Sequence, residues 1–280
     1  MVRIITDSAA DFEPNELQQL NVTCIPLRIM MGDQEFEENV NLSKPQFFEL
    51  LAQLEGAPKT SQASPQILID LFRDARAAGD EAIYITLSSA LSGTYQTAQM
   101  ICEDEGGDSC FVVDSKNATG GQRLLVEYAC RLRDEGKTAK EIIAGVESIR
   151  EKVVLYACID TLEYLYKGGR ISQTVYKLGT MAQVKPVIRV SEEGKIEVPS
   201  KAMGMRKGIE ILLKRLETQK PSADHPLYVM FTPKPDNAQQ LLEKVRSMGY
   251  TVPERCFISV GGAIGSHIGH NGCGIVYVEE

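Results

Sequence analysis

Short apolar stretches alternate with amphipathic helical patterns through the first two-thirds of the chain, and this alternation constrains the fold most. Val2–Thr6, 81–87 and 110–114 are typical of strands, and each precedes a segment with helical periodicity. Another helix is indicated after Ser64, where Pro65 occupies the first helical position. Strands that alternate with helices of this length form right-handed βαβ units. The pattern therefore predicts an α/β fold with a parallel sheet.

The pattern changes after residue 152. Strands expected at Val184–Val190 and Ile196–Pro199 flank a hairpin turn at Glu193-Gly194, which indicates antiparallel pairing. Two expected helices and three expected strands follow, at 206–219, 237–248, 227–232, 256–260 and 274–279. These elements predict a mixed or antiparallel sheet with helices.

The length of the chain is consistent with two domains. It has 280 residues, about twice the ~150 residues typical of one domain. On the pattern of elements alone, we expect an N-terminal α/β domain at 1–152 and a C-terminal α+β domain at 153–280.

Charge and cysteine content bound the class of function. The net charge of −8 argues against a general binder of nucleic acid or of anionic membranes, with at most transient membrane contact. No apolar run reaches the ~18 residues that a membrane span needs, and the N-terminus lacks the apolar segment of a signal peptide. The seven cysteines form no CxxC pair and are typical of reduced thiols. A soluble cytoplasmic protein is expected.

Four polar stretches stand where loops leave the ends of predicted strands: Thr6–Ser8, Lys59–Gln62, Ser88–Thr94 and Asp114–Gly121. In open parallel sheets, ligands bind in the crevice at the carboxyl ends of the strands. Small hydroxyl side chains in that crevice can donate hydrogen bonds and still let a ligand approach the backbone. These stretches therefore predict a ligand site at one sheet edge.

Ser92 is the most informative residue of these stretches. It lies near the expected N-cap of a helix, where unpaired amides of Gly93, Thr94 and Tyr95 favour an anion. The alternative is that Ser92 only caps its own helix. Thr60 has the same ambiguity, as a second hydroxyl donor to the anion or as a turn residue before Ser64.

Two glycine-bearing segments supply further candidates. Lys167-Gly-Gly-Arg170 follows a helical pattern, so Arg170 either projects toward the crevice or is a surface residue at a helix C-cap. The segment 261–274 is rich in glycine, which indicates tight turns or backbone packed against a ligand. His267 in that segment is either accessible to the ligand or a satisfied structural histidine.

Several familiar catalytic motifs are absent. The sequence has no GxxxxGK[ST] phosphate loop, no GxGxxG after a strand, no HExxH and no zinc-ligand spacing. A Ser92/His267/Asp7 triad has no support from spacing, because Ser92 does not lie in a GxSxG turn. The residues thus indicate an anion site on an α/β scaffold and leave the anion unnamed.

Seven segments together resemble the DegV family, in the family's order and over nearly the whole chain. They are TDSAADF, KTSQASP, LSSALSGTYQTA, VVDSKNATGGQ, TLEYLYKGGRIS, VKPVIRV with the following EEGKI, and the G-x-H-x-G segment around His267. The chain departs from the family pattern at Ala63, where the family has proline, and at His270-Asn271, where the family pattern differs after the site histidine.

The resemblance implies a long-chain fatty acid such as palmitate, stearate or oleate, held between two α/β domains. It implies a non-catalytic subunit, with no metal and no cofactor, that presents the carboxylate to a separate ATP-dependent fatty acid kinase. By position, Thr60 and Ser92 match the family's carboxylate-binding hydroxyls. The residues implied to support them are Ser61, Gly93, Thr94, Arg170 and His267. An enzyme acting on a small acyl or phosphorylated substrate in the same crevice is the alternative, and a regulatory binding protein is a third option.

Overall fold

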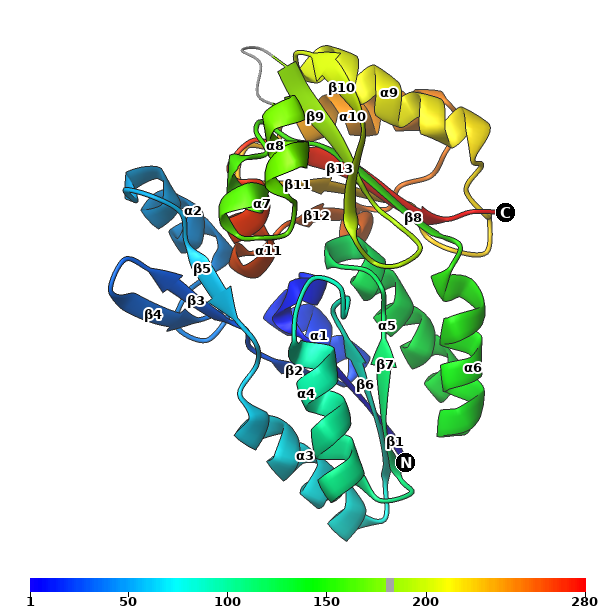
Figure 1. Cartoon of the computed structure of the whole chain (residues 1–280). Helices are drawn as coiled ribbons and strands as arrows, with labels where there is room; N and C mark the ends of the chain where they lie inside the picture. The colour runs from blue at the N-terminus through cyan, green and yellow to red at the C-terminus, as the bar shows by residue number, and fades with distance from the viewer. Residues whose placement is uncertain (180–183) are drawn as a thin grey trace.

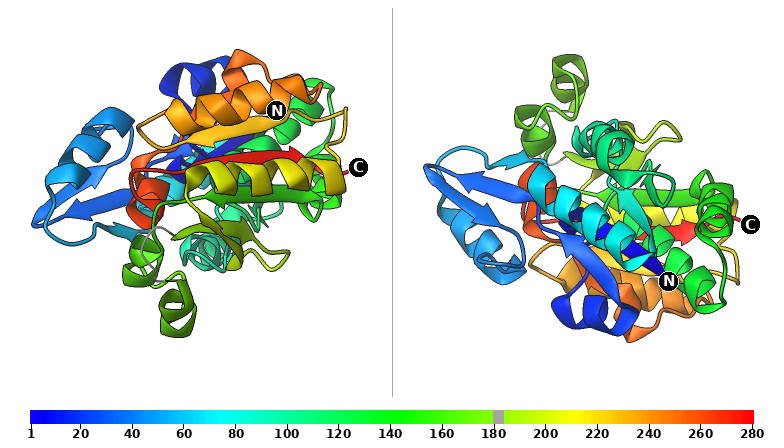
Figure 2. Two further views of the ribbon diagram at one scale, coloured as in Figure 1. Left: turned by 90° about the horizontal axis from the view of Figure 1, so that it is seen from above. Right: turned by 90° about the horizontal axis from the view of Figure 1, so that it is seen from below.

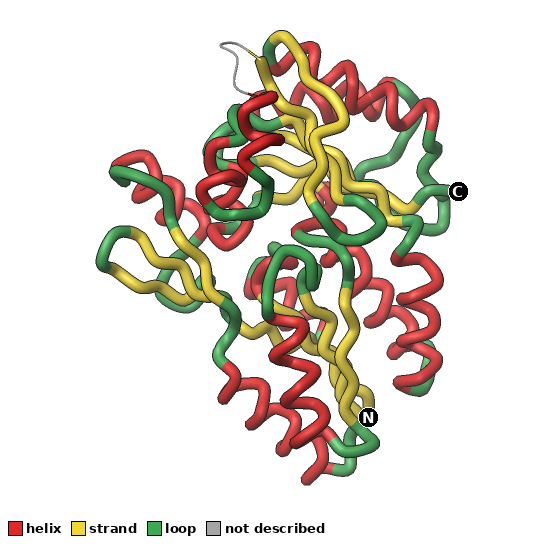
Figure 3. The backbone as a smooth tube through the Cα atoms, in the orientation of Figure 1, coloured by secondary structure: helices red, strands yellow, loops and turns green. Residues whose placement is uncertain are grey.

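The computed structural model describes residues 1–179 and 184–280, which form three sheets surrounded by helices (Figure 1, Figure 3). The first sheet contains β1 (Val2–Asp7), β2 (Val22–Ile25), β6 (Glu81–Thr86) and β7 (Cys110–Asp114), all parallel, in the order β2-β1-β6-β7. Its helical elements are α1 (Pro14–Leu20), α3 (Pro65–Ala78), α4 (Thr94–Ile101), α5 (Thr119–Asp134), α6 (Ala139–Arg150) and two short turns, η1 (Ser8–Ala10) and η2 (Cys102–Gly106).

Helices cover both faces of this sheet, with α3 and α4 on one face and α5 and α6 on the other. The alternation of side chains along the strands explains why. Ile5 and Tyr84 pack into the hydrophobic cluster under α3 and α4, whereas Ile4 and Ile83 pack into the cluster under α5 and α6. The predicted α/β fold with a parallel sheet is confirmed.

A small antiparallel sheet forms an arm, defined here as residues 28–61. It consists of β3 (Arg28–Met31), β4 (Gln34–Glu37), α2 (Lys44–Gln53) and β5 (Lys59–Ser61), with strand order β4-β3-β5. Figure 2 shows the arm projecting from one side of the molecule. We expected a single β-rich stretch over Val22–Met31, but that stretch is divided between two sheets around Pro26, which has no N–H to continue a ladder.

The third sheet has six strands in the order β10-β9-β8-β13-β11-β12, and only β11 and β12 are parallel neighbours. Its strands are β8 (Val153–Cys158), β9 (Val184–Val190), β10 (Ile196–Met203), β11 (Tyr228–Phe231), β12 (Phe257–Ser259) and β13 (Cys273–Val278). The associated helices are α7 (Glu163–Lys167), α8 (Gln173–Gly179), α9 (Met205–Thr218), α10 (Asp236–Ser247), α11 (Gly262–Ile268) and the turn η3 (Glu254–Cys256). The predicted mixed sheet is confirmed, including the hairpin turn at Gly194.

The glycine-rich segment 261–274 differs from the expectation of tight turns, because most of its first half is the helix α11. Glycine weakens a helix, so packing must supply its stability. A Cβ on Gly262 would lie 2.8 Å from the Phe47 ring, and one on Gly265 would lie 2.9 Å from the Phe48 ring. Only glycine at these positions lets α11 approach α2 of the arm so closely.

The chain passes from the four-stranded to the six-stranded sheet between Arg150 and Val153. Helix α5 packs against strands of both sheets, so one large hydrophobic cluster continues from one to the other. The division into domains at 1–152 and 153–280 stays a prediction.

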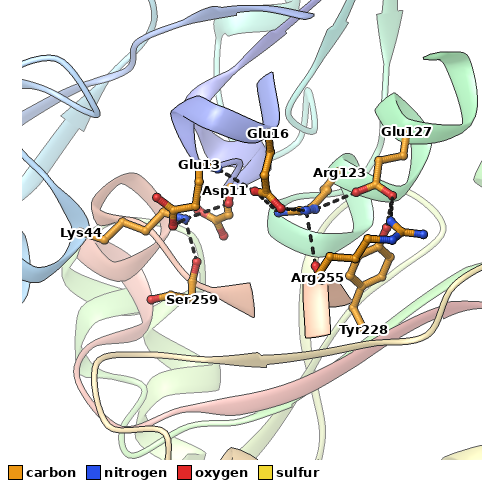
Figure 4. Close-up of polar contacts among 9 residues, drawn as sticks. All are labelled: Asp11, Glu13, Glu16, Lys44, Arg123, Glu127, Tyr228, Arg255 and Ser259. Atoms are coloured by element: carbon orange, nitrogen blue, oxygen red, sulfur yellow. Dashed lines mark hydrogen bonds and ion pairs between the residues drawn. The ribbon is translucent and has the colours of Figure 1, made fainter. Parts of the chain in front are cut away.

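Buried charges connect the parts where they meet (Figure 4). Lys44 of α2 is buried, and its Nζ donates to the Asp11 carbonyl at 2.8 Å and to the Ser259 carbonyl at 3.1 Å. Arg123 of α5 is also buried and forms ion pairs with Glu16 and Glu127. A buried cation without such partners is strongly destabilising, so these contacts hold the arm and both sheets in one arrangement.

Candidate functional site

An apolar cavity of about 300 Å³ lies between the six-stranded sheet, the arm and the loops of the four-stranded sheet. The sheet supplies an apolar wall of six side chains: Leu155, Ala157, Ile159, Ile188, Val190 and Ile196. Polar residues from three separate segments, Thr60, Ser92 and Arg170, also line it, together with His267. Exposed residues beside them, such as Ser61 and Gly93, place this polar end at the surface.

Thr60 and His267 meet at this polar end. Thr60 lies on β5 of the arm and His267 near the end of α11, and their Oγ1 and Nε2 atoms are 2.9 Å apart. The histidine tautomer decides which of the two atoms donates. Nδ1 of the same ring is sealed from solvent and has no partner among the described residues.

The His267 ring is neutral near pH 7. Burial, reinforced by the nearby charge of Arg170, lowers the pKa of His267 to about 3. A neutral ring can donate or accept a hydrogen bond but adds no charge to the site. Nε2 contacts Thr60 and Nδ1 has no partner in the described structure, so the role of His267 toward a ligand stays a prediction.

The two glycines of the Lys167–Arg170 turn have different roles. Gly169 has φ +74°, a left-handed conformation that favours glycine. Gly168 has ordinary backbone angles, but a Cβ on it would overlap the imidazole of His267. The turn therefore ends α7 and at the same time makes room for the histidine.

Arg170 is half-buried and lines the cavity. Its Nε donates to the Leu91 carbonyl at 2.9 Å, and its Nη1 donates to the Gly168 carbonyl. Burial lowers the pKa of Arg170, and no carboxylate of the described residues forms an ion pair with it. The guanidinium thus holds two loops together and keeps its charge at the polar end of the cavity.

Ser92 lies immediately before the N-cap residue Gly93, and α4 begins at Thr94. Its Oγ accepts a hydrogen bond from the Thr94 amide at 3.2 Å and lies 2.9 Å from Thr94 Oγ1. The expectation of an unpaired Thr94 amide is therefore wrong, because the Ser92 hydroxyl already occupies it. Thr94 itself is buried and does not line the cavity.

The structure thus gathers six of the seven predicted site residues around one cavity: Thr60, Ser61, Ser92, Gly93, Arg170 and His267. The predicted polar stretch Thr6–Ser8 does not line it. Instead, Asp7 is buried and accepts hydrogen bonds from Leu87 N at 2.9 Å and Gln122 Nε2 at 3.1 Å. Asp7 thus holds the loop that carries Ser92. Burial raises the pKa of the Asp7 carboxyl group to about 6. His270 also lies outside the lining and packs near the Phe48 ring.

Sequence reasoning missed the apolar wall and several polar residues that line the cavity, among them Gln62 and Thr119. Gln62 follows Thr60 and Ser61, and its Oε1 accepts from Thr97 Oγ1 at 3.0 Å, which connects the arm to α4. Thr119, the first residue of α5, is buried and also lines the cavity. Both occur in polar stretches that the sequence singled out, but only the fold shows which side chains face inward.

The family model of DegV proteins matches residues 1–280. The chain belongs to the DegV family. It is 30% identical over 275 residues to a DegV domain-containing protein of Clostridium perfringens, a match that covers 95% of this chain and 93% of that one.

Solved DegV structures have the same fold. The structure is similar to a DegV family protein from Thermus thermophilus described for its fatty acid binding, with TM-score 0.90 and 27% identity over 100% of this chain and 99% of that one. It is also similar to a fatty-acid-binding DegV family protein from Streptococcus agalactiae, with TM-score 0.88 and 25% identity over 100% and 99% of the two chains.

The described residues contain neither a metal-binding cluster nor a membrane-spanning helix. Within 1–179 and 184–280, no three His, Cys, Asp or Glu side chains are grouped so that they could hold a metal ion. Across the same residues, no helix has the length and apolar character needed to cross a membrane.

Proposed function

We propose that this DegV protein binds a long-chain fatty acid such as palmitate, stearate or oleate, with the carboxylate at Arg170 and the tail in the apolar cavity. The observation that carries the proposal is the unpaired charge of Arg170 at the polar end of an otherwise apolar cavity. A desolvated cation is costly without a counter-charge, so the site favours an anion. A chain that is apolar beyond its anionic group fits the rest of the cavity.

Neutral groups beside Arg170 would also bind the carboxylate. The hydroxyls of Thr60 and Ser92 and the imidazole of His267 lie at the same end of the cavity as Arg170. Hydrogen bonds from neutral donors to a charged acceptor contribute roughly 1.5–3 kcal/mol each. Such a site holds the carboxylate without covering it on all sides, since Ser61 and Gly93 beside it are exposed.

The apolar wall would supply most of the affinity. Each methylene that leaves water contributes about 0.8 kcal/mol before the cost of ordering the chain. The six aliphatic side chains of the sheet wall present no polar group to the tail. A small acyl or phosphorylated substrate would leave this wall exposed to water, so the cavity favours a long chain.

The finer part of the proposal is that the protein presents the carboxylate to a separate ATP-dependent fatty acid kinase in the cytoplasm. It rests on the DegV resemblance and on the exposed polar end of the cavity. The sequence lacks a phosphate-binding loop, so the kinase must supply ATP binding and Mg²⁺. The protein itself would act as the carrier subunit and would need no cofactor.

Native mass spectrometry of protein purified from bacteria tests the fatty-acid proposal. We expect a co-purified acid of 14–18 carbons, much reduced in Arg170→Ala. Arg206→Ala is the matched control, because the Arg206 side chain is 86% exposed and lies outside the cavity lining. An empty wild-type site, or a bound small acyl or phosphorylated compound, contradicts the proposal and favours the enzyme alternative.

Incubation with ATP, Mg²⁺ and oleate tests the carrier role separately. The purified protein alone should form no acyl phosphate, and added fatty acid kinase should produce it. Acyl phosphate that increases in proportion to highly purified protein alone would contradict a carrier role.

A further inference from the structure

Met230 of β11 belongs both to the cavity lining and to the large hydrophobic core between α5 and the six-stranded sheet. It is 3% exposed and lies on the face of the six-stranded sheet that forms the apolar wall. Cross-strand pairing sets Ala157 opposite Gly274, and Gly274 opposite Met230. The smallest residues of the wall therefore lie directly beside Met230 and leave a trough along the sheet.

Two glycines make the space that the Met230 side chain occupies. A Cβ on Gly120, at the start of α5, would lie 2.9 Å from Met230 Sδ, and one on Gly274 would lie 3.0 Å from Met230 Cε. The side chain is thus clamped between α5 and the sheet. Methionine is unbranched and adapts to irregular spaces, so it closes this gap without a fixed shape of its own.

Thr119 also contacts the Met230 side chain, and it does so with a strained backbone conformation. It has φ +47°, a left-handed conformation that is strained for a β-branched residue. Its Oγ1 lies 3.5 Å from Met230 Sδ and also donates to the carboxylate of Asp11. The Asp11 carboxylate thereby holds Thr119 in the conformation that sets its side chain against Met230.

We infer that Met230 is the stop for the end of the acyl chain and so selects chain length, an inference that rests on the proposed fatty-acid binding. The polar end fixes the carboxylate, and the distance from there to Met230 determines how many methylenes are buried. A chain that is too long meets Met230 and either displaces it or leaves carbons outside the cavity. A shorter chain leaves space in front of it.

Met230→Ala removes three non-hydrogen atoms from the end of the cavity, space for about three chain carbons. Each further methylene that becomes buried is worth about fourfold in affinity. In competition among saturated acids of 12–20 carbons, the preferred length should therefore increase by two or three carbons. Met205→Ala is the matched control, because Met205 contacts Cys158 on the opposite face of the same sheet and does not line the cavity.

Gly272→Ala is the second test, in case Met230→Ala does not fold. A Cβ on Gly272 would lie 3.4 Å from Ile159 Cγ2, an ordinary contact, and would narrow the cavity by one methyl group. The preferred chain should become shorter by about one carbon.

Native mass spectrometry with the acid mixture measures all three variants. A folded Met230→Ala with the wild-type length preference, or with equal weakening for all lengths, overturns the inference. So does an unchanged preference in Gly272→Ala. A wild-type protein that binds no fatty acid of any length refutes the proposed function instead, so the two failures are distinguishable.

Discussion

Gly168 and Gly169 are neighbours whose replacement by alanine should have different consequences for binding. In Gly168→Ala the new methyl overlaps the His267 ring, so the ring must move away from Thr60. In Gly169→Ala the methyl meets nothing within 4 Å, but the residue keeps φ +74°. One substitution therefore disturbs the carboxylate-binding end and the other strains only the backbone.

The magnitudes follow from these two causes. Overpacking costs roughly 1–3 kcal/mol, and a left-handed L-residue costs roughly 1–2 kcal/mol, so both variants should lose similar stability. Displacing His267 also removes a hydrogen bond to a charged ligand, about 1.5–3 kcal/mol, which weakens fatty-acid binding roughly 10- to 100-fold. Gly169→Ala should bind within about twofold of wild type.

Calorimetric titration with oleate and thermal denaturation measure the two effects on the same samples. The expected pattern is similar melting temperatures for the two variants and a large difference in affinity. Equal affinities would refute the reasoning, because they would mean that His267 does not need its place beside Thr60 to bind the ligand.

Two further predictions concern the same site, and a third concerns Glu38, a buried carboxyl group of the arm that lies outside the cavity lining. Thr60→Ala and Ser92→Ala should each weaken fatty-acid binding by roughly 1.5–3 kcal/mol without unfolding the protein, as titration and circular dichroism would show; unchanged affinity in both removes their assigned role. Arg170→Ala should lower turnover with the cognate kinase more than it lowers fatty-acid affinity, since charge increases in the transition state; equal losses in coupled assay and titration count against it. Burial raises the pKa of Glu38 from 4.5 to about 7, so the folded state binds its proton more tightly and stability should rise as pH falls from 7.5 to 5. Glu38→Gln should flatten that rise in melting temperature, and an identical pH dependence in the variant contradicts it.

The elements that sequence reasoning predicted are those whose signals are local. The helix predicted after Ser64 begins at Pro65, and the hairpin turn predicted at Glu193-Gly194 connects β9 and β10. The strand predicted at Val2–Thr6 likewise follows from a short apolar run in the sequence. These signals depend on neighbours in the chain and need no knowledge of the fold.

The arm and α11 were missed because tertiary packing determines them. Val22–Met31 is β-prone on both sides of Pro26, and nothing in its periodicity shows that β2 and β3 join different sheets. Glycine at 262 and 265 argues against a helix until the rings of Phe47 and Phe48 are known to lie against it.

The residues of the candidate site also fall into those that the sequence predicts and those that only the fold shows. Polar residues in loops, such as Ser92 and Arg170, are conspicuous in sequence because hydroxyls and charges stand out beside glycine. Met230 is not conspicuous, since it lies in an apolar strand and reads as an ordinary core residue. Only the cross-strand pairing with Gly274 shows that it borders a cavity.

The polar end of the cavity depends on close packing between the arm and α11. Thr60 and His267 are 207 residues apart in the chain, yet their side chains share one hydrogen bond. The two residues meet because Gly262 and Gly265 let α11 lie directly on Phe47 and Phe48 of the arm. Any side chain at those glycines would move α11 outward by part of its own size and separate the pair. The geometry that would bind the carboxylate is therefore set by glycine–aromatic packing, and neither segment contains it alone.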